Sequence, residues 1–146
     1  MFEPKSILVP TDFSVYSDKA LKEAVDIAVK NKSKIYLLHV IDEIAQCSVD
    51  YCLDTSVVAQ VEEQSKKFAE EKLQKEVAAI GASKDIEIVF DIKKGDAAKV
   101  IATEQEEKGI DLIVIASHGK KGMLTRLGSV SERVLREAKG PVMLVK

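Results

Sequence analysis

Apolar positions along the chain alternate between short continuous runs and stripes with helical spacing. Short continuous runs are typical of buried strands, and apolar residues three and four positions apart are typical of the inward face of a helix. The runs predict five strands, at residues 6–10, 35–41, 86–92, 112–116 and 142–145. The stripes predict four helices between them, at residues 17–31, 57–80, 97–108 and 129–139. Strands and helices that alternate in this way build a parallel sheet with helices on both faces.

The third predicted strand differs from the other four. Its residues alternate between apolar and polar, whereas the other runs are apolar on both faces. Alternation indicates that one face of a strand is partly in water. Residues 86–92 are therefore expected at an edge of the sheet.

The second predicted helix is long and heavily charged, and it follows a polar, irregular stretch at residues 42–56. Its charged run, residues 62–75, is expected to form a solvated face with ion pairs one helical turn apart. Six apolar residues are expected to face inward: Val57, Val61, Phe68, Leu73, Val77 and Ile80.

Composition and charge limit the classes of function. The 146 residues fit one domain, residues 1–146, and the formal charge of −2 does not provide the basic face that nucleic acid requires. The longest apolar run, residues 112–116, is far shorter than the roughly twenty residues of a membrane span. The N-terminus lacks the basic and apolar regions of a signal peptide. We therefore expect a cytoplasmic chain with no nucleic-acid partner and no membrane partner.

The two cysteines, Cys47 and Cys52, lie in the same polar stretch with four residues between them. A zinc site would need a second pair of ligands, and a thioredoxin-type motif has two intervening residues. Reduced, non-catalytic thiols are the expectation, with a local disulfide or redox response as the alternative. His39 lies inside an apolar strand and is expected to be a hydrogen-bonded core residue rather than a ligand.

Two polar segments follow predicted strands, at residues 10–14 and 116–129. In open α/β sheets, ligands bind beyond the carboxyl ends of the strands, where the strand order reverses. Glycines let a backbone approach an anion closely, and a helix N-terminus at Ser129 would add amide donors. Lys120, Lys121 and Arg126 would raise the positive potential there. The second segment is thus a candidate phosphate site. On spacing alone, a solvated loop closed by a Gly–Ser cap fits equally well.

Five segments together resemble the universal stress protein family over the whole chain: residues 5–14, 37–40, 116–119, 128–135 and 140–145. The resemblance implies an α/β fold, a single-domain three-layer sandwich of the Rossmann-like, adenine nucleotide alpha hydrolase-like type. It implies a five-stranded parallel sheet in the order 3-2-1-4-5, which agrees with the expected edge strand. It also implies a homodimer and, for one branch of the family, binding of ATP.

The resemblance also implies roles for single residues. Pro10, Thr11 and Asp12 would border the adenine and ribose, and Val40 would contact the adenine through its backbone. The phosphates would be held by Gly119, Gly128, Ser129 and Val130. Ala116 and His118 complete the nucleotide-binding set. For Asp12 a turn or helix cap is the alternative, and for His118 it is stabilisation of the loop.

The chain departs from the ATP-binding pattern, G-x2-G-x9-G-[ST], at two points. Ala116 stands at the first glycine, and eight residues rather than nine separate Gly119 from Gly128. Gly122 can give the shorter loop compensating freedom. The expected function is a stress-response module that binds ATP with Mg²⁺, or ADP or AMP. The alternatives are a nucleotide-free dimeric interaction protein and a slow ATP hydrolase. No catalytic residue and no protein ligand to a metal is assigned.

The fifth predicted strand forms the sheet edge opposite the third in the implied order. Its residues are apolar at every position: Val142, Met143, Leu144 and Val145. A bare edge of this kind exposes unpaired backbone groups, which proteins usually cover. A second copy related by a two-fold axis can cover it, so a homodimer through this strand is expected. The alternative is a monomer in which the flanking helices hide the strand.

Overall fold

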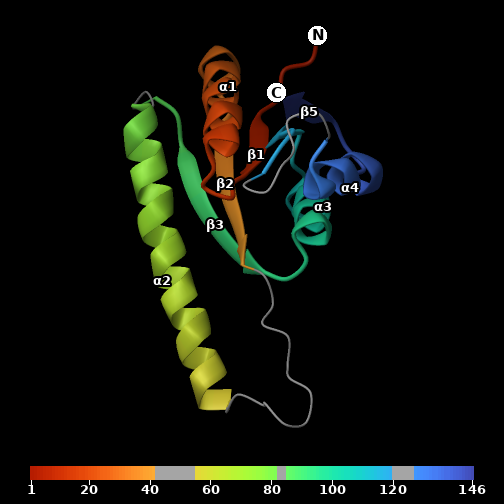
Figure 1. Cartoon of the computed structure of the whole chain (residues 1–146). Helices are drawn as coiled ribbons and strands as arrows, with labels where there is room; N and C mark the ends of the chain where they lie inside the picture. The colour runs from red at the N-terminus through yellow and green to blue at the C-terminus, as the bar shows by residue number, and fades with distance from the viewer. Residues whose placement is uncertain (42–54, 82–84, 120–126) are drawn as a thin grey trace.

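Strands and helices alternate along the chain in the computed structural model, which describes residues 1–41, 55–81, 85–119 and 127–146 (Figure 1). The elements are β1 (Ser6–Pro10), α1 (Val15–Asn31), β2 (Lys34–Ile41), α2 (Thr55–Ile80), β3 (Ile88–Lys94), α3 (Ala97–Lys108), β4 (Leu112–Ala116), α4 (Ser129–Glu137) and β5 (Val142–Val145). Every predicted strand and helix is present, and no described end is displaced by more than two residues. Cys47 and Cys52 lie outside the described residues.

The sheet has the strand order β3-β2-β1-β4-β5, and every neighbouring pair is parallel. The order confirms the expectation for the fold and places β3 at one edge, as its alternating pattern predicts. β5 forms the other edge. The strand order reverses at β1 and β4, which pair through Ile7 and Leu112. Such a reversal leaves a crevice for ligands beyond the carboxyl ends of the two strands.

The core consists of two apolar layers, one on each face of the sheet. Neighbouring side chains on a strand point to opposite faces, so a strand in the middle of the sheet needs apolar cover on both. Ile7 and Val9 pack with residues of α1 and α2, whereas Leu8 packs with residues of α3 and α4. Figure 1 shows the two pairs of helices on opposite sides of the sheet.

α2 corrects one expectation from the sequence. Leu73 is fully buried, and Val77 and Ile80 pack against the core, as predicted. Val57, Val61 and Phe68 are instead 40%, 38% and 58% exposed. A helix of 26 residues is about 39 Å long, and its N-terminal end projects beyond the sheet (Figure 1). Val57 and Val61 lie at this end, whereas Phe68 lies further along the helix, next to the buried Ala69 but outside the covered face.

Candidate functional site

The chain makes a tight, strained turn directly after β1. Phe13 has a φ of 65°, a conformation that bulky residues rarely adopt. Two hydrogen bonds hold the turn, because the amide of Phe13 donates to Oγ1 of Thr11 and the amide of Ser14 donates to Oδ1 of Asp12, each at 3.0 Å. Strain of this kind persists only where the surrounding groups fix it. The turn is thus a rigidly held feature at the carboxyl edge of the sheet.

Asp12 serves this turn with one carboxylate oxygen and faces the segment after β4 with the other. The cap of α1 is Ser14, whose side chain accepts from the amide of Ser17 at 3.2 Å. Within the structural alternative to nucleotide binding, a turn or a helix cap, Asp12 is therefore a turn residue and not the cap. A Cβ atom added to Gly119 would lie only 2.8 Å from Oδ2 of Asp12. The fold brings these two predicted site residues together.

The segment after β4 lies against the beginning of α4. The amide of Gly128 donates to the carbonyl of Ser117 at 2.7 Å. A Cβ atom on Gly128 would lie 3.3 Å from that carbonyl oxygen and 3.7 Å from the nitrogen of Gly119. The φ of Gly128 is −62°, which any residue can adopt. Glycine is favoured at this position by close approach, not by backbone conformation.

α4 begins with Gly128 as its cap, without a hydrogen bond from a capping side chain. The first amides of a helix lack partners within the helix, and they carry the positive end of the helix dipole. Ser129 and Val130 are exposed at this end. The start of α4 can therefore offer amide donors to an anion. Lys120, Lys121, Gly122 and Arg126 lie outside the described residues.

Ala116 contributes no side chain to the surface of this region. It is 6% exposed and packs in the core layer formed by α1 and α2. The hydroxyl of Ser131 donates to its carbonyl at 2.5 Å, which ties α4 to the end of β4. The position of the pattern's first glycine is thus filled by a methyl group that lies in the core.

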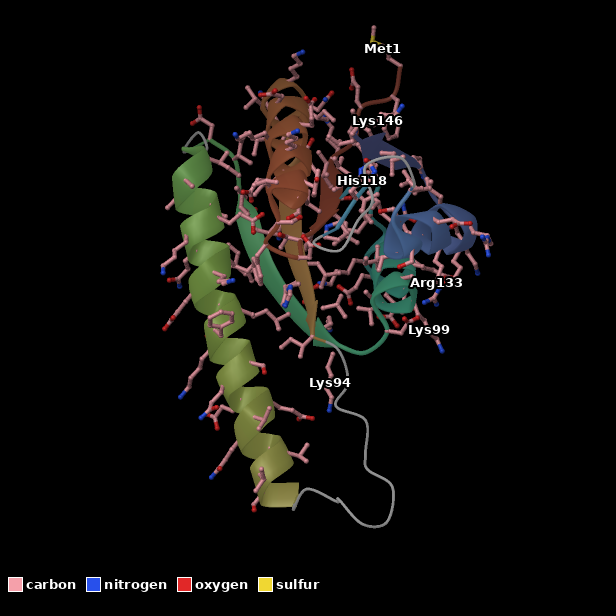
Figure 2. The ribbon with its side chains drawn as sticks, viewed as in Figure 1. Met1, Lys94, Lys99, His118, Arg133 and Lys146 are labelled. Carbon is pink, nitrogen blue, oxygen red and sulfur yellow. The ribbon has the colours of Figure 1, made fainter. Side chains whose placement is uncertain are left out.

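His39 lies near the turn after β1, and His118 lies in the segment after β4. Nδ1 of His39 is 2.9 Å from the carbonyl oxygen of Thr11, and the His39 ring lies 4.4 Å from that of Phe13. His39 is hydrogen-bonded as expected, although it is half-buried, and it supports the turn. His118 lies between α1 and α4 in Figure 2, with its ring 5.6 Å from that of Tyr16.

Nδ1 of His118 is 2.8 Å from the hydroxyl of Ser117. Its Nε2 is buried and has no hydrogen-bond partner in the part of the chain that the structure describes. Among the other predicted residues, Pro10 ends β1, and Val40 lies on β2 and packs towards α3 and α4. The side chains of Thr11 and Ala116 are buried. The other residues predicted to bind a nucleotide lie at the carboxyl edge of the sheet.

The side chain of Thr11 is buried and contacts a residue that the sequence did not single out, Glu76 of α2. Oγ1 of Thr11 lies 3.0 Å from both carboxyl oxygens of Glu76. Glu76 is only 8% exposed. In the sequence Glu76 directly follows the charged run at residues 62–75, so it was not distinguished from the solvated face. Its spacing from Ala69 and Leu73 continues the inward face of α2, and that spacing could have identified it.

Burial raises the pKa of Glu76 from 4.5 to about 8, because the charged form is poorly solvated there. The neighbouring carboxylates of Asp18 and Asp12 raise the pKa further, whereas the hydrogen bond from Thr11 lowers it. A hollow of about 270 Å³ lies beside Glu76, lined also by Phe13, Asp18, Lys72 and Lys75.

No group of three or more His, Cys, Asp or Glu side chains among residues 1–41, 55–81, 85–119 and 127–146 is placed to hold a metal ion. None of the helices in those ranges is long and apolar enough to cross a membrane.

The strand order and the helices on both faces of the sheet define a doubly wound α/β protein, whose switch point lies between β1 and β4. Residues 3–146 match the universal stress protein family, and the chain belongs to it. The universal stress protein MJ0577 of Methanocaldococcus jannaschii is 34% identical over 158 residues, covering 97% of this chain and 94% of its own length. Its solved structure has a TM-score of 0.80 and 29% identity, covering 100% of this chain and 97% of that one.

Two other family structures share the fold and were solved with adenine nucleotides. One is a universal stress protein in complex with cAMP, with a TM-score of 0.68 and 22% identity over 98% of this chain and 97% of that one. The other is the Archaeoglobus fulgidus protein in complex with dAMP, with a TM-score of 0.64 and 18% identity over 100% of each chain.

Proposed function

We propose that this protein binds an adenine nucleotide in the crevice between the turn after β1 and the start of α4, and acts as a stress-response module. The observation that carries the proposal is the approach of Gly119 to the Asp12 carboxylate, with the uncapped end of α4 directly beside Gly119. A carboxylate accepts hydrogen bonds from ribose hydroxyls, and helix-end amides donate to phosphates. One crevice thus offers groups for both parts of a nucleotide.

In this proposal Pro10, Thr11 and Asp12 border the adenine and ribose, and Val40 contacts the adenine through its backbone. Thr11 takes part through its main chain, because its side chain is committed to Glu76. Gly119, Gly128, Ser129 and Val130 hold the phosphates, with His118 beside them. Ala116, the last residue of β4, takes part only through its packing in the core.

Family membership and the chemistry of the crevice support an adenine nucleotide. The cAMP and dAMP bound by two relatives are monophosphates. ATP with Mg²⁺ is the proposed ligand, and ADP and AMP are the alternatives that the test separates. Regulation by occupancy is proposed, and no residue is assigned a catalytic role. A cytoplasmic location belongs to the proposal, and cell fractionation tests it.

Homodimerisation through β5 is also proposed. Strand β5 lies at the sheet edge, its residues are not fully buried, and Met143 is 37% exposed. A second copy can cover these apolar side chains and the free backbone groups of the edge.

The test of nucleotide binding begins with the purified protein, which is denatured so that any co-purifying nucleotide can be identified by chromatography. Titration calorimetry with ATP, ADP and AMP, with and without Mg²⁺, then measures affinity. A ligand at a hundred times its Kd stabilises the folded state by about 2.7 kcal/mol, which a thermal shift detects. Absence of co-purifying nucleotide together with flat calorimetry for all three ligands overturns the proposal.

Asp12→Asn sharpens the test, because an amide oxygen can still accept from Ser14 and keep the turn. Its lost charge is expected to weaken nucleotide binding. Asp111→Asn is the matched control, since Asp111 also accepts from backbone amides, those of Lys5 and Ser6, but outside the proposed site. It is expected to bind nucleotide like the wild type.

A further inference from the structure

Glu76 reaches from α2 to the turn that carries Asp12. Its carboxyl oxygens both lie 3.0 Å from Oγ1 of Thr11, and the same Oγ1 accepts from the amide of Phe13 at 3.0 Å. Asp12 lies between Thr11 and Phe13 in the chain. A single hydroxyl therefore connects α2 to the backbone on both sides of Asp12.

We propose that Glu76 is a positioning residue for the nucleotide site: with its proton it holds the turn in the binding geometry, and without it nucleotide binding weakens. The inference rests on the proposed function. It adds a form of regulation, because the affinity of the crevice becomes dependent on pH through a residue that does not touch the ligand.

The charges around Glu76 favour the neutral form of its carboxyl group. Asp12 faces it from the turn after β1, Asp18 faces it from α1, and Lys72 and Lys75 of its own helix line the neighbouring hollow. Both aspartates disfavour a third negative charge, and burial acts in the same direction. The neutral form of Glu76 is the one that fits these surroundings.

Protonation changes what Glu76 can do for the turn. A neutral carboxyl group can accept from the hydroxyl of Thr11, and it adds no negative charge beside Asp12 and Asp18. A carboxylate still accepts from Thr11, but it repels Asp12 and Asp18. Because Phe13 is held at a positive φ partly by the same Thr11 oxygen, repulsion at this point allows the turn to relax. Asp12 then moves relative to Gly119.

The size of the effect has an upper limit. With a pKa of about 8, the neutral fraction falls from about 0.76 at pH 7.5 to about 0.03 at pH 9.5. If only the neutral form binds, the apparent Kd rises by at most about 25-fold over this range. We expect a rise of at least fivefold. Nucleotide phosphates are already ionised at pH 7.5, so their titration contributes little.

The experiment measures the affinity for ATP with Mg²⁺, and for AMP, between pH 7.5 and 9.5. Glu76→Gln imitates the neutral form, and it is expected to bind as tightly as the wild type at pH 7.5 and equally tightly at pH 9.5. The matched control is Glu104→Gln. Glu104 is 4% exposed and its pKa is also raised by burial, but it lies on α3, in the other helical layer. This control is expected to follow the wild-type profile.

A flat wild-type profile, or a Glu76→Gln profile that falls like the wild type, overturns the inference. A second measurement needs no nucleotide. The amide NMR signals of Asp12 and Phe13 are expected to shift with a midpoint near pH 8 in the wild type and to stay constant in Glu76→Gln. If no nucleotide binds at any pH, the proposed function fails, and unshifted amides then show separately that Glu76 does not control the turn.

Thr11 provides variants that remain informative if Glu76→Gln does not fold. Thr11→Val removes the hydroxyl that connects Glu76 to the turn, so its affinity is expected to be lower and less dependent on pH. Thr11→Ser keeps the hydroxyl and is expected to restore the wild-type profile. A Thr11→Val protein that retains the full pH dependence overturns the inference.

Discussion

The amide of Gly128 donates to the carbonyl oxygen of Ser117 at 2.7 Å, so the first residues of α4 lie directly against the chain that leaves β4. A Cβ atom at Gly128 would lie 3.3 Å from that oxygen, which is a tight contact. Gly128→Ala is therefore expected to lower the unfolding free energy by less than about 1 kcal/mol. Gly128→Val adds two branches and is expected to lower it by about 1–3 kcal/mol, the range of overpacked sites.

Both substitutions at Gly128 are expected to weaken nucleotide binding, by at least tenfold for valine, or about 1.4 kcal/mol. Since valine also disturbs the protein backbone, affinity is compared with urea unfolding of the same variants. Ser129→Ala is the control, because it removes only a hydroxyl at an exposed position and leaves the backbone amides of this segment in place. Unchanged affinity in a folded Gly128→Val protein would place the phosphates elsewhere.

Gly119 and Asp12 are expected to act as one unit. A methyl group on Gly119 would meet Oδ2 of Asp12 at 2.8 Å, while Oδ1 is held by the amide of Ser14. Gly119→Ala should therefore displace the carboxylate and weaken nucleotide binding about tenfold, or about 1.4 kcal/mol. Asp12→Asn should have an effect of similar size. Residues in direct contact give non-additive effects, so the double variant should lose less than the sum. Additive losses in calorimetry would mean that the two residues act separately.

Glu76 should make the stability of the protein depend on pH. The native state keeps the Glu76 proton up to about pH 8, whereas the unfolded chain releases it near pH 4.5. The native state therefore binds more protons in this window, and the contribution of Glu76 to the unfolding free energy falls as the pH rises from 4.5 to 8. Glu76→Gln should match the wild type at pH 4 and exceed it at pH 8.5 by at least about 1.4 kcal/mol, the equivalent of one pKa unit.

Urea unfolding at a series of pH values measures this difference. Glu71→Gln, on the exposed face of the same helix, is the matched control and should give a difference that does not change with pH. A constant difference for Glu76→Gln would mean that Glu76 is already ionised in the folded protein at neutral pH.

The sequence predicted the strands well because four of them are apolar on both faces, a pattern that only a doubly covered sheet requires. It predicted the edge position of β3 from a single alternating run. It was wrong about Val57, Val61 and Phe68, because the apolar spacing of a long helix does not reveal which part of its surface the sheet covers. The contact between α2 and the turn was also missed. That contact joins Thr11 of the turn to Glu76 of α2, 65 positions apart, and depends on how α2 packs in the folded chain rather than on any local motif.

For the candidate site, the sequence supplied the right segments without their geometry. It could not show that a Cβ atom at Gly119 would meet Oδ2 of Asp12, nor that the methyl of Ala116 lies in the core. Both facts follow from how β1 and β4 pair. The methyl group of the alanine that departs from the family pattern thus lies in the core and not on the surface, which the spacing alone left open.

Met143 provides the cleanest test of the proposed homodimer. Leu144 and Val145 of the same strand pack against the two core layers, so a charge at either position would damage the monomer as well as an interface. Met143 belongs to neither layer and is 37% exposed at the edge of the sheet. Met143→Glu would put a negative charge on each copy in an apolar two-fold interface. The charge is expected to shift the protein from dimer to monomer with little loss of monomer stability.

Light scattering measures the outcome against the chain mass of 16.0 kDa. The wild type is expected at about twice this mass at tens of micromolar, and Met143→Glu close to it. Phe2→Glu is the matched control, because Phe2 is an equally apolar and even more exposed residue outside β5. It should leave the mass unchanged. A wild-type monomer at this concentration, or a Met143→Glu protein that stays dimeric, would show that strand β5 does not carry the interface.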